Sequence, residues 1–104
     1  MQEPLVERLL EGLRSSEPDV RERAADEVTD IHKSLGAGEV DALINGLMTA
    51  ALQESLPACQ EAELNALCDL KAWHNLDRQS LQPLAVLRSR LQPAHLEYLD
   101  ELLK

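Results

Sequence analysis

Three histidines and two cysteines are the residue types of this chain best suited to metal binding or catalysis. His32, His74 and His95 fall in three different predicted helices, and none has a second histidine four residues away. The sequence also contains no Cys-x-x-Cys pair, the spacing found in the common structural zinc motifs. The pattern gives little support for a zinc site, and we expect no metal and no cofactor.

The two cysteines, Cys59 and Cys68, lie nine residues apart in one predicted helix. Nine residues of helix rise by about 13.5 Å and place the two side chains on opposite faces. A disulfide requires Cα atoms within about 7 Å, so we expect both thiols to be free. Free thiols and the absence of a signal peptide predict a cytoplasmic protein.

The glycine-rich segment Gly36-Ala37-Gly38 superficially resembles a phosphate-binding loop. No strand precedes it and no basic residue follows it, and we interpret it as a left-handed glycine cap that ends a helix. Carboxylates are abundant, but no pair of them is positioned by a recognisable catalytic motif. We therefore predict no catalytic function. The weaker alternative, an enzymatic or cofactor-binding helical domain, would need a pocket around a histidine and two carboxylates.

The formal charge of −9 bears on possible partners. It disfavours nucleic acid and anionic membranes, because both attract proteins through lysine and arginine. The longest apolar stretch, 42–52, is far too short to span a bilayer. The charge is compatible with a basic protein partner, and simple solubility is the alternative explanation.

Acidic side chains also form a stripe within the stretch 18–35. They recur at spacings of three, four and four residues, which places them on one face of a helix. This stripe is either a solvated face or a docking surface for a basic partner. Together with residues of the later segment 61–77, the predicted partner-binding residues are Asp19, Glu22, Asp26, Asp30, Glu61, Asp69, Trp73, His74 and Asp77.

Trp73 lies near the end of a predicted helix, at the edge of its apolar face. A single tryptophan in this position is either a lid over the core or an anchor of an interface, a role in which tryptophan is enriched.

The elements that must position these residues are helices. Leucine dominates the apolar residues, phenylalanine is absent, and β-branched residues are few, so the composition predicts an all-α fold. Apolar residues recur every three or four positions, with Val20 predicted on the core face and Ser80 as an N-cap. The predicted helices span about 4–14, 18–35, 39–54, 57–74, 80–91 and 93–103. Short connections favour antiparallel neighbours.

The helices also repeat along the chain. A shift of 39 residues places Pro18 on Pro57 and Val28 on Leu67, and a shift of 40 places the third helix on the fifth. A helix pair that recurs near 40 residues has the period of HEAT and armadillo solenoids.

The segment 18–31 resembles the first helix of a HEAT repeat, which starts with proline and aspartate and continues with valine, arginine, a small pair and aliphatic residues. The matching residues here are Pro18, Asp19, Val20, Arg21, Ala24, Ala25, Val28 and Ile31. The second unit departs from this pattern, with Ala58 in place of the aspartate and Gln60 in place of the arginine.

The resemblance implies one domain, 1–104, of about six antiparallel helices stacked as a short HEAT-like α-solenoid. Its parts would be a half-repeat 1–16, repeats 17–56 and 57–92, and a capping helix 93–104. An irregular six-helix bundle is the alternative.

HEAT stacks are protein-binding scaffolds, and small acidic helical proteins of this size resemble bacterial immunity proteins. The resemblance therefore implies a non-catalytic protein that masks a basic toxin, for example a nuclease. The alternative is a regulatory or assembly adaptor that binds an apolar helix. That adaptor would have a groove between the third and fifth helices, with Met48 and Leu52 exposed.

Overall fold

The chain forms helices joined by short turns, and the computed structural model describes residues 4–104. Within this range it contains no strand, so the predicted all-α class is confirmed. The elements are α1 (Pro4–Leu13), α2 (Pro18–Ile31), the 3₁₀ turn η1 (His32–Ser34), α3 (Ala37–Gln53), α4 (Pro57–His74), α5 (Arg78–Leu81), the 3₁₀ segments η2 (Gln82–Ser89) and η3 (Pro93–His95), and α6 (Leu96–Leu103).

Proline marks the beginning of both α2 and α4. Pro18 and Pro57 lie in the first turn, where a missing N–H leaves no acceptor unsatisfied. The residues before them, Glu17 and Leu56, have an extended backbone, as proline requires of its neighbour. The predicted beginnings of these two helices are confirmed.

The predicted left-handed glycine cap at 36–38 was wrong. No glycine in the described part of the chain has a positive φ. Helix α2 instead ends in η1, where the Ser34 hydroxyl donates to the Ile31 carbonyl at 2.9 Å. Gly36 is the N-cap of α3, and its N–H donates to the Glu39 carboxylate at 2.8 Å. A left-handed cap is found at Asn75, after α4, with φ of 55°.

The predicted single helix over 80–91 was also wrong. The segment begins earlier, with Asp77 rather than Ser80 as N-cap, and the Asp77 carboxylate accepts a hydrogen bond from the Gln79 N–H at 3.0 Å. After the short α5 the chain continues as the 3₁₀ segment η2. The last predicted helix likewise starts as a 3₁₀ turn, η3, before α6.

Leucine spacing accounts for the 3₁₀ geometry of η2. Leu81, Leu84 and Leu87 recur every third residue, and a helix with three residues per turn aligns such residues on one side. All three side chains are buried. The spacing therefore suits a 3₁₀ helix better than an α-helix, in which the third leucine would drift around the axis.

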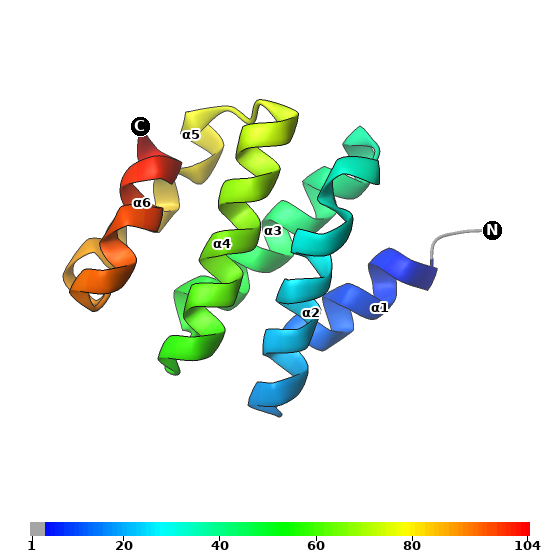
Figure 1. Ribbon diagram of the computed structural model, residues 1–104, viewed down its shortest axis with the longest axis horizontal. Helices are drawn as coiled ribbons and strands as arrows, with labels where there is room; N and C mark the ends of the chain where they lie inside the picture. The colour runs from blue at the N-terminus through cyan, green and yellow to red at the C-terminus, as the bar shows by residue number, and fades with distance from the viewer. Residues whose placement is uncertain (1–3) are drawn as a thin grey trace.

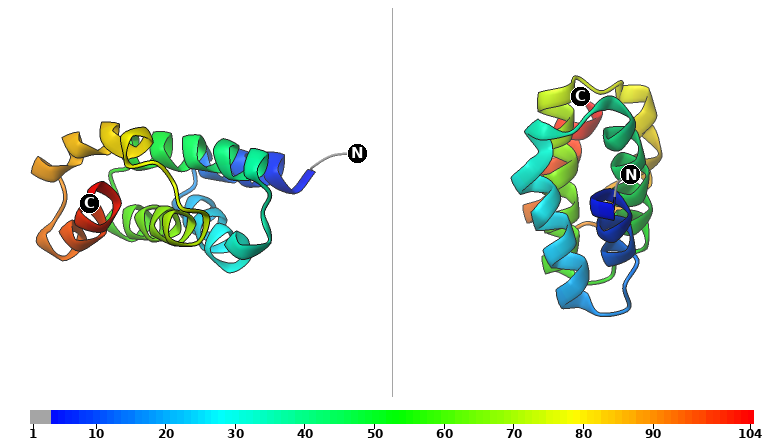
Figure 2. Two further views of the ribbon diagram at one scale, coloured as in Figure 1. Left: turned by 90° about the horizontal axis from the view of Figure 1, so that it is seen from above. Right: turned by 90° about the vertical axis from the view of Figure 1, so that its right-hand side faces the viewer.

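The helices form two layers. Figure 1 shows α2, α4 and α6 side by side. In the left view of Figure 2, α1, α3 and the α5–η2 segment form the second layer, so the chain alternates between the layers. Helix α4 is central, because it contacts α2, α3 and α6.

The space between the layers is filled mainly by leucine. Burying one leucine side chain stabilises a fold by roughly 1.5–3 kcal/mol. Val20 is an exception to the predicted core, because its side chain is 36% exposed. The largest fully buried apolar residues are Leu9, Leu43, Leu47, Leu64, Leu67, Leu70, Leu81, Leu84, Leu87, Leu99 and Leu102.

No helix within residues 4–104 combines the length and the apolar character required to cross a bilayer.

Candidate functional site

Acidic charge is concentrated in one of the two layers. Helices α2, α4 and α6 together carry eleven acidic and three basic residues, whereas α1, α3, α5 and η2 carry four acidic and three basic residues. We call the outward side of α2, α4 and α6 the acidic face. The sequence predicted an acidic stripe on one helix, and the two-layer arrangement places two further acidic helices beside it.

The acidic face contains a hollow between α2 and α4. Its volume is about 280 Å³, and the lining residues are Glu22, Asp26, Ala58, Glu61, Ala62, Asn65 and Tyr98. The two alanines on α4 leave room that larger side chains would fill. Carboxylates from two helices therefore border a space that is open to a side chain from outside.

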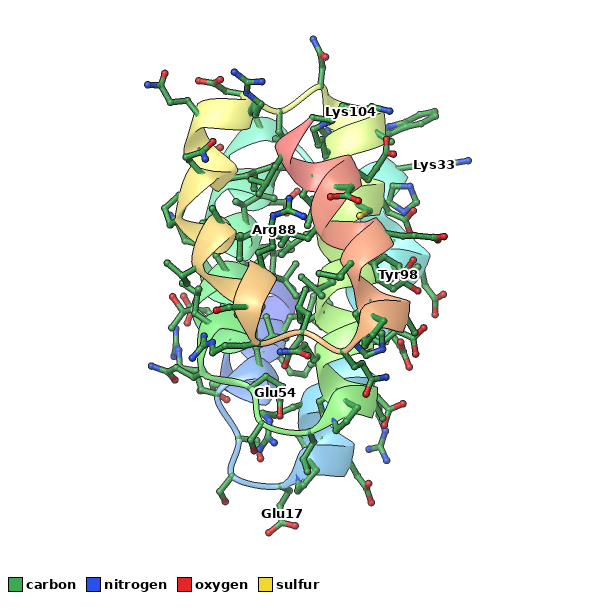
Figure 3. All side chains as sticks on the ribbon, turned by 90° about the vertical axis from the view of Figure 1, so that its left-hand side faces the viewer. Glu17, Lys33, Glu54, Arg88, Tyr98 and Lys104 are labelled. Carbon is green, nitrogen blue, oxygen red and sulfur yellow. The ribbon has the colours of Figure 1, made fainter. Side chains whose placement is uncertain are left out.

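Tyr98 closes the α6 side of this hollow, and Figure 3 shows it on the helix next to α4. Its hydroxyl donates to the Glu61 carboxylate at 3.0 Å. Burial, followed by the hydrogen bond to Glu61 and the charge of Glu61, raises the pKa of Tyr98. The other Glu61 oxygen lies 4.0 Å from Nε2 of His95, a residue that is 3% exposed. The hydrogen bond from Tyr98 therefore orients one oxygen of the Glu61 carboxylate.

A second hollow lies between α4 and α6. Its volume is about 450 Å³, and it is lined by Cys68, Glu97, Tyr98, Asp100 and Glu101. Burial, followed by the charges of Glu101 and Asp69, raises the pKa of the Cys68 thiol to about 12. A thiol with so high a pKa is a poor nucleophile, because the reactive form is the thiolate.

Trp73 lies at the end of α4, where η1 also lies. Its side chain is 55% exposed, so it is not the lid over the core that the sequence left as one possibility. Nζ of Lys33 is 4.9 Å from the centroid of the Trp73 ring, and the His32 ring meets it edge to face at 6.4 Å. His74 is bound close by, with Nε2 2.7 Å from the His32 carbonyl oxygen. Figure 3 shows Lys33 at the end of the molecule opposite Glu17.

The structure brings together only part of the predicted site. Glu22, Asp26 and Glu61 share the first hollow, while Trp73 and His74 share the α4 end. The remaining predicted residues have other settings: Asp19 and Asp30 are exposed on α2, Asp69 is half-buried on α4, and Asp77 caps α5.

Sequence reasoning missed the contribution of α6. Its acidic residues Glu97, Asp100 and Glu101 extend the acidic face, and Tyr98 borders both hollows. The signal for this was present, since three carboxylates stand within five residues of a leucine-rich helix. What the sequence lacked was the placement of that helix beside α4.

The groove that an adaptor for an apolar helix would need is not formed as the sequence predicted. Met48 is 8% exposed and belongs to the core, and Leu52 is only partly exposed. No observation therefore favours this alternative.

Within residues 4–104, no group of three or more histidine, cysteine, aspartate or glutamate side chains is placed to hold a metal ion. No protein-family model, curated protein or solved structure matches the chain.

Proposed function

We propose that this chain is a non-catalytic, cytoplasmic protein-binding module that neutralises a basic toxin, such as a nuclease, in the manner of an immunity protein. Its partner is a protein, and it binds neither nucleic acid nor membranes. The observation that carries this proposal is the concentration on α2, α4 and α6 of ten acidic residues that are exposed or half-buried; the eleventh, Glu63, is buried and does not belong to the acidic face.

The hollow between α2 and α4 supports a basic partner in particular. Glu22 and Asp26 approach it from one side and Glu61 from the other. A lysine or arginine side chain that entered it would meet carboxylates from two helices, and charge-assisted hydrogen bonds are the stronger kind. The bond from Tyr98 holds Glu61 before any partner arrives, which lowers the ordering cost of binding.

Trp73 is the proposed apolar anchor of the same interface. Tryptophan is enriched among residues whose truncation weakens binding most. More than half of this side chain is exposed, and its contacts with Lys33 and His32 restrict its orientation. A large exposed ring that is already oriented suits recognition better than a mobile one.

The finer architecture that we propose is the short HEAT-like α-solenoid, with repeats 17–56 and 57–92. Two features support it: the chain alternates between two layers, and related residues recur at a shift of about 39. In such a stack the acidic face is built from one helix of each successive pair.

The test uses charge reversal on the acidic face and a matched reversal on the other layer. The double variant Asp26→Lys/Asp30→Lys changes two exposed residues of α2, and Glu7→Lys/Glu11→Lys makes the same change in charge on α1. Binding to the purified product of the neighbouring gene is measured by calorimetry at low and high salt. We expect the α2 variant to bind at least about tenfold more weakly and the α1 variant to bind within about threefold of the wild type.

An unrelated small basic protein is the control for non-specific attraction. The proposal is wrong if neither the neighbouring product nor a panel of basic nucleases binds at low salt. It is also wrong if the two double variants weaken binding equally, because the layer that carries the charge would then not matter.

A further inference from the structure

An ion pair fastens α2 to the turn between α3 and α4. Nε and Nη2 of Arg21 each donate to one oxygen of Glu54 at 2.9 Å, and Nη1 donates to the Ser15 carbonyl at 3.0 Å. The Glu54 side chain is 1% exposed and the Arg21 side chain 17%. Two-point pairing of this kind is among the strongest side-chain contacts that a protein makes.

Glu63 of α4 adds a second carboxyl group to this cluster. It is fully buried, and neither of its oxygens accepts a hydrogen bond from any donor in the described part of the chain. After burial, the Glu54 carboxylate is the neighbour that acts most strongly on the pKa of Glu63, through a hydrogen bond and through its charge. Two ionised carboxylates offer acceptors only, so they cannot bond to each other unless one of them carries a proton.

We propose that Glu63 and Glu54 share one buried proton in the folded chain at neutral pH, and that its loss in alkaline solution loosens the junction of α2, α3 and α4. The proton resides on Glu63, whose O–H donates to Glu54, and Arg21 balances the charge of Glu54. Without the proton, the cluster would hold a buried negative charge that nothing balances, which is strongly unfavourable.

The surroundings of Glu63 support this assignment. Burial, followed by the hydrogen bond and negative charge of Glu54, raises the pKa of Glu63 from 4.5 to about 9, and Arg21 offsets this only in part. For Glu54, burial acts to raise the pKa, but hydrogen bonds from Arg21, Glu63 and the Leu56 N–H outweigh it, and the pKa is lowered.

The other titratable groups near Glu63 are few. Cys59 lies one turn earlier on α4, and burial raises the pKa of its thiol as well. Among the elements that pack against α4, α2 contributes Arg21 and the end of α3 contributes Glu54, and these are the charged groups that act on the pKa of Glu63. The proton on Glu63 is therefore governed by burial, Glu54 and Arg21.

The direction of the pH effect follows from the pKa of Glu63, which is about 9 in the folded chain against an ordinary 4.5. The folded chain binds this proton more tightly than the unfolded chain. Its contribution to stability is fully present below about pH 4.5 and is lost as the pH rises through about 9. Between these limits, one linked proton raises the unfolding equilibrium constant about tenfold per pH unit.

The first test is urea unfolding of the full chain from pH 5 to pH 9.5, with wild type compared with Glu63→Gln. Glutamine cannot ionise and keeps a donor for Glu54. We expect the ratio of the wild-type unfolding constant to that of Glu63→Gln to rise by up to about tenfold per pH unit. Glu11→Gln, an exposed glutamate of α1, is the control and should follow the wild type. Parallel pH profiles for wild type and Glu63→Gln would overturn the proposal.

A second measurement needs no variant. Carboxyl resonances of wild-type protein labelled with ¹³C in its glutamate side chains report each titration directly. We expect one glutamate to remain protonated at pH 7 and to titrate near pH 9. The proposal is wrong if every glutamate of the folded chain is ionised by pH 6.

Discussion

Replacing Gly12 with alanine should destabilise the protein, although alanine is the better helix former. Gly12 lies in α1, and a Cβ at this position would be 2.8 Å from the Cβ of Ala24 in α2. The Ala24 Cβ is fixed to its backbone, so no change of rotamer can relieve the contact. The two helices would have to move apart, and the leucines between the layers would lose contacts.

The change in the free energy of unfolding that we expect for Gly12→Ala is the difference between two opposing effects. Alanine gains roughly 0.8–1.0 kcal/mol over glycine in the interior of a helix. Overpacking of a tight contact typically loses about 1–3 kcal/mol, and a contact between two rigid backbones belongs toward the upper end. The expected net result for Gly12→Ala is a loss of about 1–2 kcal/mol in the free energy of unfolding.

Two other glycines serve as matched controls. At Gly38 an added Cβ would meet nothing within 4 Å, so Gly38→Ala should be stabilising by up to about 1 kcal/mol. At Gly46 the added Cβ would be 2.5 Å from Cδ2 of Leu10, the far end of a flexible side chain that can turn away. The stability of Gly46→Ala should therefore lie between the stabilities of the other two variants.

Urea unfolding followed by circular dichroism measures all three variants at one pH. The expected order of stability is Gly38→Ala, then Gly46→Ala, then Gly12→Ala. If Gly12→Ala is at least as stable as the wild type, the close approach of α1 and α2 is refuted.

Two further predictions concern single side chains. The pKa of the Cys68 thiol is about 12, where 9 is ordinary, so its thiolate fraction at pH 8 is roughly a thousandfold smaller than that of an ordinary cysteine. The other thiol, that of Cys59, is almost fully buried. Both thiols should thus react with a thiol reagent far more slowly in the folded protein than in urea, and equal rates would contradict their burial. Trp73→Ala should lower the free energy of unfolding by no more than about 1 kcal/mol, the size of an exposed cation–π contact, because this ring is not part of the core. Urea unfolding of that variant checks the value, and a loss above about 3 kcal/mol, as for a buried aromatic, would contradict it.

The sequence predicted the α-helices best where local rules act alone. Pro18 and Pro57 begin helices because proline suits the first turn and disfavours helix in the residue before it. The predicted left-handed cap at 36–38 was wrong for a related reason. A glycine between two helices suits either the end of the first helix or the beginning of the second. The Glu39 side chain decided between them by capping the start of α3.

Glu63 was the hardest residue to predict. Its position four residues before Leu67 and seven before Leu70 places it on the buried side of α4, whereas a carboxylate is expected to face water. The helical spacing indicates the buried side correctly, whereas the residue type indicates the exposed side. The residue type misleads because the proposed proton removes the charge that normally keeps a glutamate side chain in water. Its neighbour Glu54 comes from the end of another helix, and no local pattern shows that the two lie together.

The acidic face was predictable only in part. The stripe on α2 follows from spacing along one helix, but the hollow with Glu61 and Tyr98 depends on how α2, α4 and α6 pack. The 3₁₀ geometry of η2 agrees with the three-residue spacing of Leu81, at the end of α5, and of Leu84 and Leu87 in η2, and the prediction of an α-helix overlooked this spacing.

The 3₁₀ segment η2 has a consequence for how the fold opens. Hydrogen bonds between residues three apart have poorer geometry than those of an α-helix, and η2 lies near one end of the molecule, with Val86 61% exposed. Its amide protons should exchange with solvent through local opening, whereas those of α4, enclosed by α2, α3 and α6, exchange only when the whole chain unfolds. The centre of the protein should thus open only on global unfolding, whereas the end that contains η2 opens locally. Proteases would therefore cleave first near residues 82–89.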